Sequence, residues 1–379
     1  MRAKHLATSI SAIVGVAGLA FTVGGAGIVG ADGTETLGPP SIPISEGSGV
    51  VVAGVGLELI QPGTIDIDVP VGATVEQVLL YWEGQSSTPT GDETIEVNAT
   101  EVTGVLIGGP TLFFEGAYSS TYRADITSLG AVSAGANSVA VGGLSFDYVN
   151  NGAGLAVIYD DGTTADIRIV DGNDLAFINF EPTLDTTVAQ TFTFPSAEVD
   201  RVASLSLFFS SVTGPASGGG DVRPSTIRAI SGGVVSEGIN LLDSNDGDEW
   251  DSDTFEVNIP AGATELTVQA LSEDATGDGQ DPLAASFAWN AATLAVPVPP
   301  PPPTTPTTVP DTTTPDTTVP ETTTPPTVAP TTAPPETPTD ELPATGRSPW
   351  LAVGAAAALL AGIVLTLAAR RPRGAHSRI

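Results

Sequence analysis

Apolar and polar residues alternate along several short runs of the chain. In Thr64–Val69, Ala203–Phe209 and Thr254–Ile259 the apolar residues recur at every second position. Successive side chains of a strand point to opposite faces, so this period predicts strands with one face in a core. Val78–Trp82 and Leu155–Tyr159 are apolar on both faces, which predicts central strands. No run of ten residues in this region keeps a helical period, and we therefore predict an all-β fold.

Two segments of the chain echo each other, Thr64–Val78 and Thr254–Val268. Each has an alternating run, then the sequence Pro-x-Gly-Ala-Thr, then a second apolar run. Proline ends a strand because it lacks a donor, and glycine permits a sharp turn. We expect a corner between two strands that is used twice in a sandwich, with chance similarity of two β corners as the alternative.

The β-rich region covers residues 49–296, which is enough chain for one large sandwich or two packed ones. We predict a β-sandwich, or jelly-roll-like, ectodomain, and a seam near residues 181–186 would divide it into two. Residues 32–48 are rich in glycine, proline and serine, and they are predicted to form a flexible leader.

The N-terminus has the features of an export signal. Arg2 and Lys4 precede an apolar run over residues 6–23, and a small-residue pattern ends at Ala31. This order predicts a secretory signal peptide over residues 1–31, cleaved after Ala31. Cleavage at Ala26 and a retained membrane helix are the alternatives.

The C-terminus has three parts in order. An apolar run over residues 350–369 is followed by a basic tail over residues 370–379 that contains four arginines. Twenty helical residues span roughly 30 Å, which is the thickness of a hydrocarbon core, and the arginines mark the cytoplasmic end. A pentapeptide stands in front of this run: Leu342, Pro343, Ala344, Thr345 and Gly346.

This ordered C-terminus resembles the sorting signal of Gram-positive cell-wall proteins, which sortases read. The resemblance covers about the last 38 residues. It implies recognition of Leu342 and Pro343, cleavage between Thr345 and Gly346, and an amide bond from Thr345 to peptidoglycan. It also implies an extracellular protein anchored covalently to the wall. The alternative is a plain single-pass membrane protein.

A second, less specific resemblance concerns the ectodomain. The runs Leu79–Gln85, Thr121–Leu129 and Gly152–Gly162 look like an uncharacterised β-rich ectodomain found in bacterial surface proteins. This resemblance implies a location and a fold, and no activity.

The linker between ectodomain and pentapeptide, residues 297–341, consists largely of proline and threonine with a pentad repeat. Such a composition forms no core. In an extended polyproline conformation it would reach roughly 130 Å, enough to cross a thick wall.

Composition excludes several chemistries. The whole chain has a net charge of −32, and residues 32–345 hold all 44 acidic residues but five arginines and no lysine, histidine or cysteine. Nucleic acid is therefore excluded as a partner. Catalysis by Ser-His-Asp or Cys-His, the usual zinc sites, disulfides and lysine isopeptide bonds are excluded as well. Three classes remain: a non-catalytic adhesion or binding module for an extracellular ligand or glycan, a structural wall component, and a glycoside hydrolase that uses carboxylates alone.

Carboxylates and amides are densest between residues 243 and 253. Such loops supply the oxygen ligands that Ca²⁺ prefers, and a solvated acidic loop is the alternative. The candidate calcium ligands are Asp243, Asn245, Asp248, Asp251 and Asp253.

Aromatic residues would mark a sugar site if they were exposed in a cleft. The candidates are Tyr81, Trp82, Trp250 and Trp289, and burial of these rings in the core is the alternative.

Overall fold

The fold was analysed in a computed structural model, which describes residues 31, 33–181, 183–214, 223–275, 277 and 283–299. Over these residues the chain is all-β, as predicted, with four antiparallel sheets and one short 3-10 turn, η1 (Thr127–Leu129). None of these residues belongs to a helix that is long and apolar enough to cross a membrane. Residues 1–30 of the predicted signal peptide, the linker beyond Pro299, the sorting pentapeptide, the apolar run and the basic tail lie outside the described residues.

The first sandwich consists of strands β2 to β10. Its inner sheet, here inner sheet 1, has the order β2-β10-β4-β8-β7, and outer sheet 1 has the order β3-β9-β5-β6. The bounds are β2 Gly49–Gly56, β3 Gly63–Val69, β4 Thr74–Ser86, β5 Thr94–Val97, β6 Thr100–Thr103, β7 Val105–Phe114, β8 Ala117–Asp125, β9 Gly135–Gly142 and β10 Val149–Asp160.

The second sandwich consists of β1 and of strands β11 to β18. Inner sheet 2 has the order β1-β11-β18-β13-β16, and outer sheet 2 has the order β12-β17-β14-β15. The bounds are β1 Leu37–Gly38, β11 Ala165–Ala176, β12 Gln190–Thr193, β13 Arg201–Ser210, β14 Thr226–Ser231, β15 Val234–Ile239, β16 Trp250–Ile259, β17 Glu265–Leu271 and β18 Phe287–Pro297.

Both sandwiches have the same strand order. In inner sheet 1 the first and last strands of the unit, β2 and β10, are paired, and β10 also pairs with β4. In inner sheet 2 the equivalent neighbours are β11, β18 and β13. This is the strand order of a jelly roll, here present twice in tandem. The chain passes from one sandwich to the other through residues 161–164, between β10 and β11. The predicted seam near residues 181–186 falls between β11 and β12, both strands of the second sandwich.

The two echoing segments form corners at which the chain crosses between sheets. The first corner joins β3 to β4, and the second joins β16 to β17. In each, the amide of the alanine donates to the carbonyl of the proline at 3.1 Å, Ala73 to Pro70 and Ala263 to Pro260. The glycines between them have φ of +87° and +82°, which glycine adopts without strain. The same corner therefore closes two different connections of the jelly roll.

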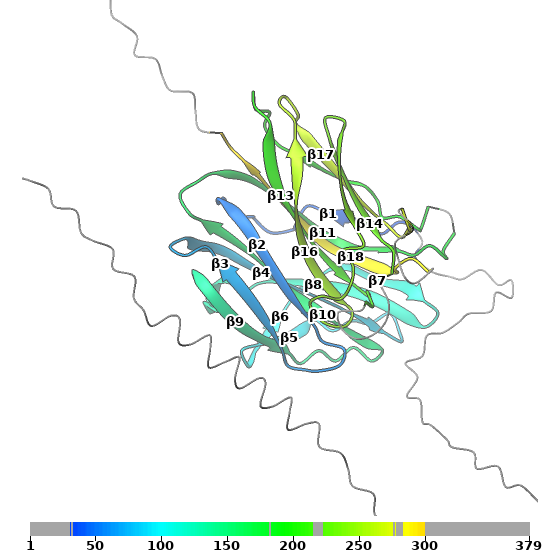
Figure 1. The fold of residues 1–379 in the computed structure, drawn as a ribbon. Coiled ribbons are helices and arrows are strands. Elements are labelled where there is room, and N and C mark those ends of the chain that lie inside the picture. The colour runs from blue at the N-terminus through cyan, green and yellow to red at the C-terminus, as the bar shows by residue number, and fades with distance from the viewer. Residues whose placement is uncertain are drawn as a thin grey trace, which may run out of the picture. The chain divides into compact units, whose positions relative to one another are not determined.

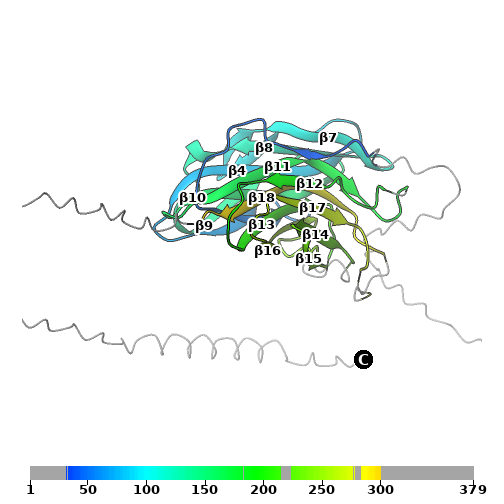
Figure 2. The same cartoon turned by 90° about the horizontal axis from the view of Figure 1, so that it is seen from above.

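The inner sheets are buried on both faces, which explains their apolar runs. The core of the first sandwich contains Leu80, Trp82 and Leu155, and the core of the second contains Leu205 and Phe209. A third apolar cluster lies between the two inner sheets and contains Leu79, Ile158, Ile169, Phe208 and Trp250. Four sheets are thus stacked, with the inner ones in the middle; Figure 1 gives the strand labels, and Figure 2 shows the blue and cyan strands on one side of the green and yellow ones.

Residues 33–48 differ from the flexible leader that their composition predicts. β1 pairs with β11, and Leu37 is buried. Ile42 and Ile44 pack against the cluster between the inner sheets, and the amide of Ser45 donates to the Gln77 side chain at 2.9 Å. A few isolated apolar residues are enough to hold this segment in place, because each packs against an apolar cluster that the strands of the two sandwiches build.

Candidate carboxylate site at the junction of the sandwiches

The surface between the two inner sheets has a polar part beside its apolar cluster. We call this part the polar junction. Its side chains come from strands of both sheets and are no more than 2% exposed. They form a connected set: the Thr121 hydroxyl donates to Asn173 Oδ1 at 3.1 Å, and Asn290 Nδ2 donates to the Thr121 oxygen at 3.0 Å. The polar junction consists of Glu83, Ser119, Thr121, Asn151, Asn173 and Asn290.

Glu83 is the acidic member of the polar junction, and it is fully buried on β4. Ser119 Oγ donates to its carboxyl group at 2.6 Å, and Asn151 Nδ2 also donates to it. Burial raises the pKa of Glu83 to about 7, and these hydrogen bonds oppose the rise. Glu83 therefore holds its proton to a higher pH than an exposed glutamate does.

A buried ion pair lies next to the polar junction and joins the two sandwiches. Arg123 on β8 contacts Asp171 on β11, and the two side chains are 1% and 4% exposed. The Tyr81 hydroxyl donates to the same Asp171 oxygen at 3.3 Å, and Arg123 Nη2 donates to Ser41 Oγ at 2.9 Å. Burial raises the pKa of Asp171, and the Arg123 charge opposes that rise.

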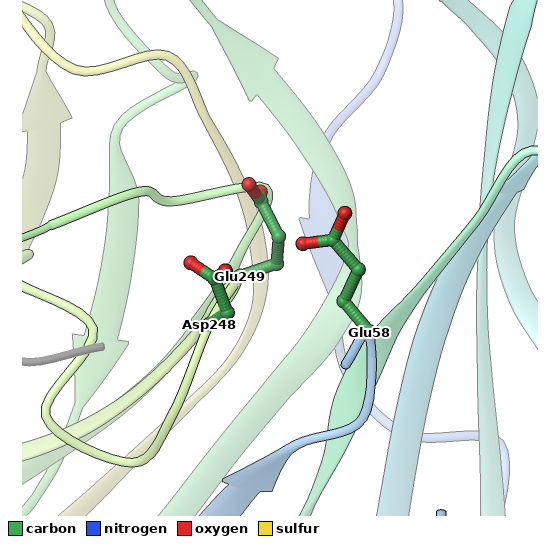
Figure 3. A group of neighbouring side chains, drawn as sticks. All are labelled: Glu58, Asp248 and Glu249. Carbon is green, nitrogen blue, oxygen red and sulfur yellow. The ribbon is translucent and has the colours of Figure 1, made fainter. Parts of the chain in front are cut away.

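Three more carboxylates gather where β2 ends. Glu58 follows β2, and Asp248 and Glu249 precede β16; one carboxylate oxygen of each lies within 4.8 Å of the others. Figure 3 shows the three side chains turned toward one another. Burial raises the pKa of Glu249 to about 7. The negative charges of Glu58, Asp248 and Glu83 add to this rise in pKa. The Thr213 hydroxyl, which donates to the Glu249 carboxylate at 2.6 Å, opposes the rise. We call Glu58, Asp248 and Glu249 the carboxylate group.

The loop that carries Asp248 and Glu249 is docked on the end of β2. The Gly56 amide donates to the Asp246 carbonyl at 2.9 Å, and a Cβ at Gly56 would lie 2.3 Å from the Asp248 carbonyl oxygen. Position 56 therefore requires glycine. Glu249 has φ of +68°, a left-handed conformation that is strained for this residue.

The structure gives the predicted calcium ligands different roles. Asp248 belongs to the carboxylate group, together with Glu58 and Glu249, which the prediction did not include. Asp251 is fully buried and accepts the amides of Ser244 and Asn245 at 3.0 and 2.8 Å, so it shapes the loop.

The remaining predicted ligands are Asp243, Asn245 and Asp253. The charges of Asp243 and Asp253 repel each other, and the Asn245 side chain is hydrogen-bonded to Asp253. Among the described residues, Asp243 Oδ1 and Asp253 Oδ2 have no hydrogen-bond partner. Burial raises the pKa of Asp253 to about 7, and the charges of Asp246 and Asp243 add to the rise.

The rings named as candidates for a sugar site are buried, which is the alternative that the sequence left open. Tyr81, Trp82, Trp250 and Trp289 are each 0% exposed. Trp82 stacks on Tyr122, and Trp289 stacks on Phe209. These rings are core residues because the inner sheets are covered on both faces.

Chemically, the carboxylate group can hold a proton or a cation. Like charges this close cannot all ionise freely, and a divalent ion with oxygen ligands would offset their repulsion.

We expect Ca²⁺ to raise the melting temperature at pH 8 and constant ionic strength. At a hundredfold excess of Ca²⁺ over its Kd, the free energy of unfolding should rise by about 2.7 kcal/mol. The Glu58→Gln/Asp248→Asn variant should lose most of this gain in differential scanning fluorimetry, and Glu101→Gln, an exposed control on β6, should keep it. An equal effect of Na⁺ at matched ionic strength would show that the group is solvated surface.

The buried carboxyl groups also predict a dependence of stability on pH. The pKa values of Glu83 and Asp251 are about 7 and about 9 in the fold, above the ordinary 4.5 and 3.8. The folded state therefore keeps protons that the unfolded chain has released. The resulting stability is lost as the pH rises from about 4.5 to 7 for Glu83 and from about 3.8 to 9 for Asp251. Glu83 alone should contribute on the order of 3 kcal/mol between pH 5 and pH 8.5.

This dependence can be measured by urea unfolding at several pH values, with chelator present. The Glu83→Gln variant keeps the shape of the side chain and should have a shallower pH slope, by about one proton, and a higher stability at pH 8.5. Glu101→Gln should leave the slope unchanged. A slope that is the same in Glu83→Gln and in the parent would contradict the assignment.

Comparisons with known proteins give weak likenesses. No protein-family model matches the chain, and no curated protein matches it. Among solved structures, PNGase F, a glycosylasparaginase from Flavobacterium meningosepticum, is 8% identical over 66% of this chain and 96% of that chain, with a TM-score of 0.25. The extracellular domain of ANXUR1 from Arabidopsis thaliana is 9% identical over 72% and 95%, with a TM-score of 0.22. The CBM22 tandem domain of Paenibacillus barcinonensis Xyn10C is 8% identical over 72% and 98%, with a TM-score of 0.21. At these scores none of them carries an argument about this chain.

Proposed function

We propose that the protein is a cell-wall-anchored surface protein that displays its two sandwiches as a non-catalytic binding module. In this proposal the chain is exported, sortase cuts between Thr345 and Gly346, and Thr345 becomes joined to peptidoglycan. The observation that carries the proposal is the order of the sorting pentapeptide, the apolar run and the arginine tail at the C-terminus.

The position of the last strand supports a tethered role. β18 ends at Pro297, the residue at which the Pro/Thr-rich linker begins, and it is paired on both sides, with β11 and with β13. Tension applied through a wall anchor would run along β18 and load both ladders of hydrogen bonds together. A terminal strand at the edge of a sheet would have one ladder to resist the same force.

For export, we propose that the signal peptide is cleaved at Ala26 and not after Ala31. Ala31 is 3% exposed and belongs to an apolar cluster with Phe113, Leu175 and Phe180. A chain that begins at Asp32 would lack this contact. Cleavage at Ala26 keeps Ala31, and therefore this contact, in the mature protein.

Composition supports a binding role over catalysis. Residues 32–345 have no histidine, cysteine or lysine to act as base or nucleophile. Glu83 and Asp171, the buried carboxyl groups between the inner sheets, are held by hydrogen bonds inside the fold.

Cell fractionation tests the proposal. In a Gram-positive host with active sortase, the protein should resist hot detergent and be released by wall hydrolysis. Release by detergent alone from such cells would contradict covalent anchoring.

A further inference from the structure

The outer edge of β2 is a free sheet edge over Val50–Gly54; at its end the loop before β16 covers Gly56, whose amide donates to the Asp246 carbonyl. β2 is the terminal strand of inner sheet 1, and its sequence, Gly-Val-Val-Val-Ala-Gly-Val-Gly, has no charge and no proline. Edge strands commonly carry charges, proline or bulges that prevent pairing with another chain. The segment Val50–Gly54, which has none of these features, forms a template for one more strand.

The register with β10 shows which backbone groups face outward. The Leu57 amide donates to the Asn151 carbonyl at 3.0 Å, and β2 continues from there in an unbroken antiparallel register with β10. Hydrogen-bonded positions alternate along such a pair, so the N–H and C=O groups of Val51, Ala53 and Val55 point to β10. Those of Val50, Val52 and Gly54 point away from it.

These outward groups lie in a groove between the sheets on either side. The groove has a volume of about 450 Å³ and is lined by Val50–Ala53, by Asp66–Asp68 of β3, and by Ser204 and Thr254 of the second sandwich. A neighbouring hollow of about 410 Å³ shares Val50, Ser204 and Thr254 and continues toward β18. β2 is therefore the floor of a slot whose walls are outer sheet 1 and inner sheet 2.

The walls of this slot differ in chemistry. Asp66 and Asp68 are exposed carboxylates on the β3 wall. The opposite wall presents the small hydroxyl residues Ser204 and Thr254. Side chains of an added strand would alternate between these walls, so cationic residues at every second position would meet the aspartates.

We propose that the free edge of β2 binds an extended cationic peptide segment of another protein by strand addition. The backbone groups of Val50, Val52 and Gly54 would pair with it, and Asp66 and Asp68 would select lysine or arginine at alternate positions. Charge disfavours a second copy of this chain, because the net charge is −32 and pairing would bring two acidic walls together. It also disfavours this chain's own linker, which is acidic and whose prolines lack donors.

The test uses the full-length chain and an alternating decapeptide, (Lys-Val)5. We expect saturable binding by calorimetry that weakens with salt, with chemical-shift changes at the Val50, Val52 and Gly54 amides. The peptide N-methylated on alternate residues keeps its charge but loses donors, and it should bind about tenfold more weakly. The (Glu-Val)5 peptide should not bind.

A matched pair of charge variants distinguishes binding in this slot from attraction to the acidic surface of the protein as a whole. Asp66→Asn/Asp68→Asn should weaken binding of (Lys-Val)5 severalfold, whereas Glu96→Gln/Glu101→Gln, two exposed carboxylates on β5 and β6, should not. Equal binding of the N-methylated and unmodified peptides would show charge attraction without strand addition and overturn the proposal. Absence of binding at millimolar peptide would overturn it as well, and so would self-association of the chain through the β2 amides.

Discussion

The Arg123→Met variant should lose about 3–5 kcal/mol of folding stability. Arg123 and Asp171 form a buried ion pair between the sandwiches, and Asp171 also accepts from Tyr81. Removing the arginine leaves a buried carboxylate without its counter-charge, which is far more costly than losing an exposed pair. We expect a fall in the urea midpoint with little change in slope, measured at pH 7.

The matched control is Arg168→Met. Arg168 also pairs with an aspartate, Asp166, but its side chain is 42% exposed. This variant should lose about 0–1 kcal/mol. Combining Arg123→Met with Asp171→Leu should recover part of the loss, because the unpaired charge is then removed too. Equal losses in the two arginine variants would contradict a special role for the buried pair.

Substituting Leu342 and Pro343 by alanine should abolish wall attachment. Sortase recognition is the step that the resemblance assigns to these residues, and no other segment of the proposal joins the chain to the wall. We expect nearly all of the protein to become extractable by detergent, because the apolar run over residues 350–369 would be retained in the membrane.

The control for this experiment lies just outside the pentapeptide. Ser348→Ala, two residues after Gly346, should leave the wall-linked fraction unchanged. Wall attachment that persists in the Leu342→Ala/Pro343→Ala variant would mean that the pentapeptide does not direct anchoring.

The strands could be predicted from the sequence because their signal is local. The alternation in Thr64–Val69 and Thr254–Ile259 corresponds to β3 and β16, and the continuous apolar runs Val78–Trp82 and Leu155–Tyr159 are neighbouring strands inside inner sheet 1. The Pro-x-Gly-Ala corners could be recognised for the same reason. Each of these features is decided within about 15 residues.

The junction could not be predicted, because its residues come together through packing of the two sandwiches. Glu83 follows an apolar run, and its partners Ser119 and Asn151 lie on other strands. Glu58 stands alone in the sequence and meets Asp248 and Glu249 from a loop 190 positions away. The density of acidic residues in the sequence points to the loop of Asp248 and Glu249, but it does not point to Glu58. Hydrophobic periodicity likewise predicts that one face of a strand is buried, but it does not show that another sheet packs on that face.

Mass spectrometry of the wall-released protein tests the central claim of anchored display most directly. After digestion with a muramidase and a protease, the C-terminal peptide should end at Thr345 and carry the mass of a peptidoglycan stem peptide on its carboxyl group. A C-terminal peptide that continues through Gly346 into the apolar run would contradict anchoring by sortase.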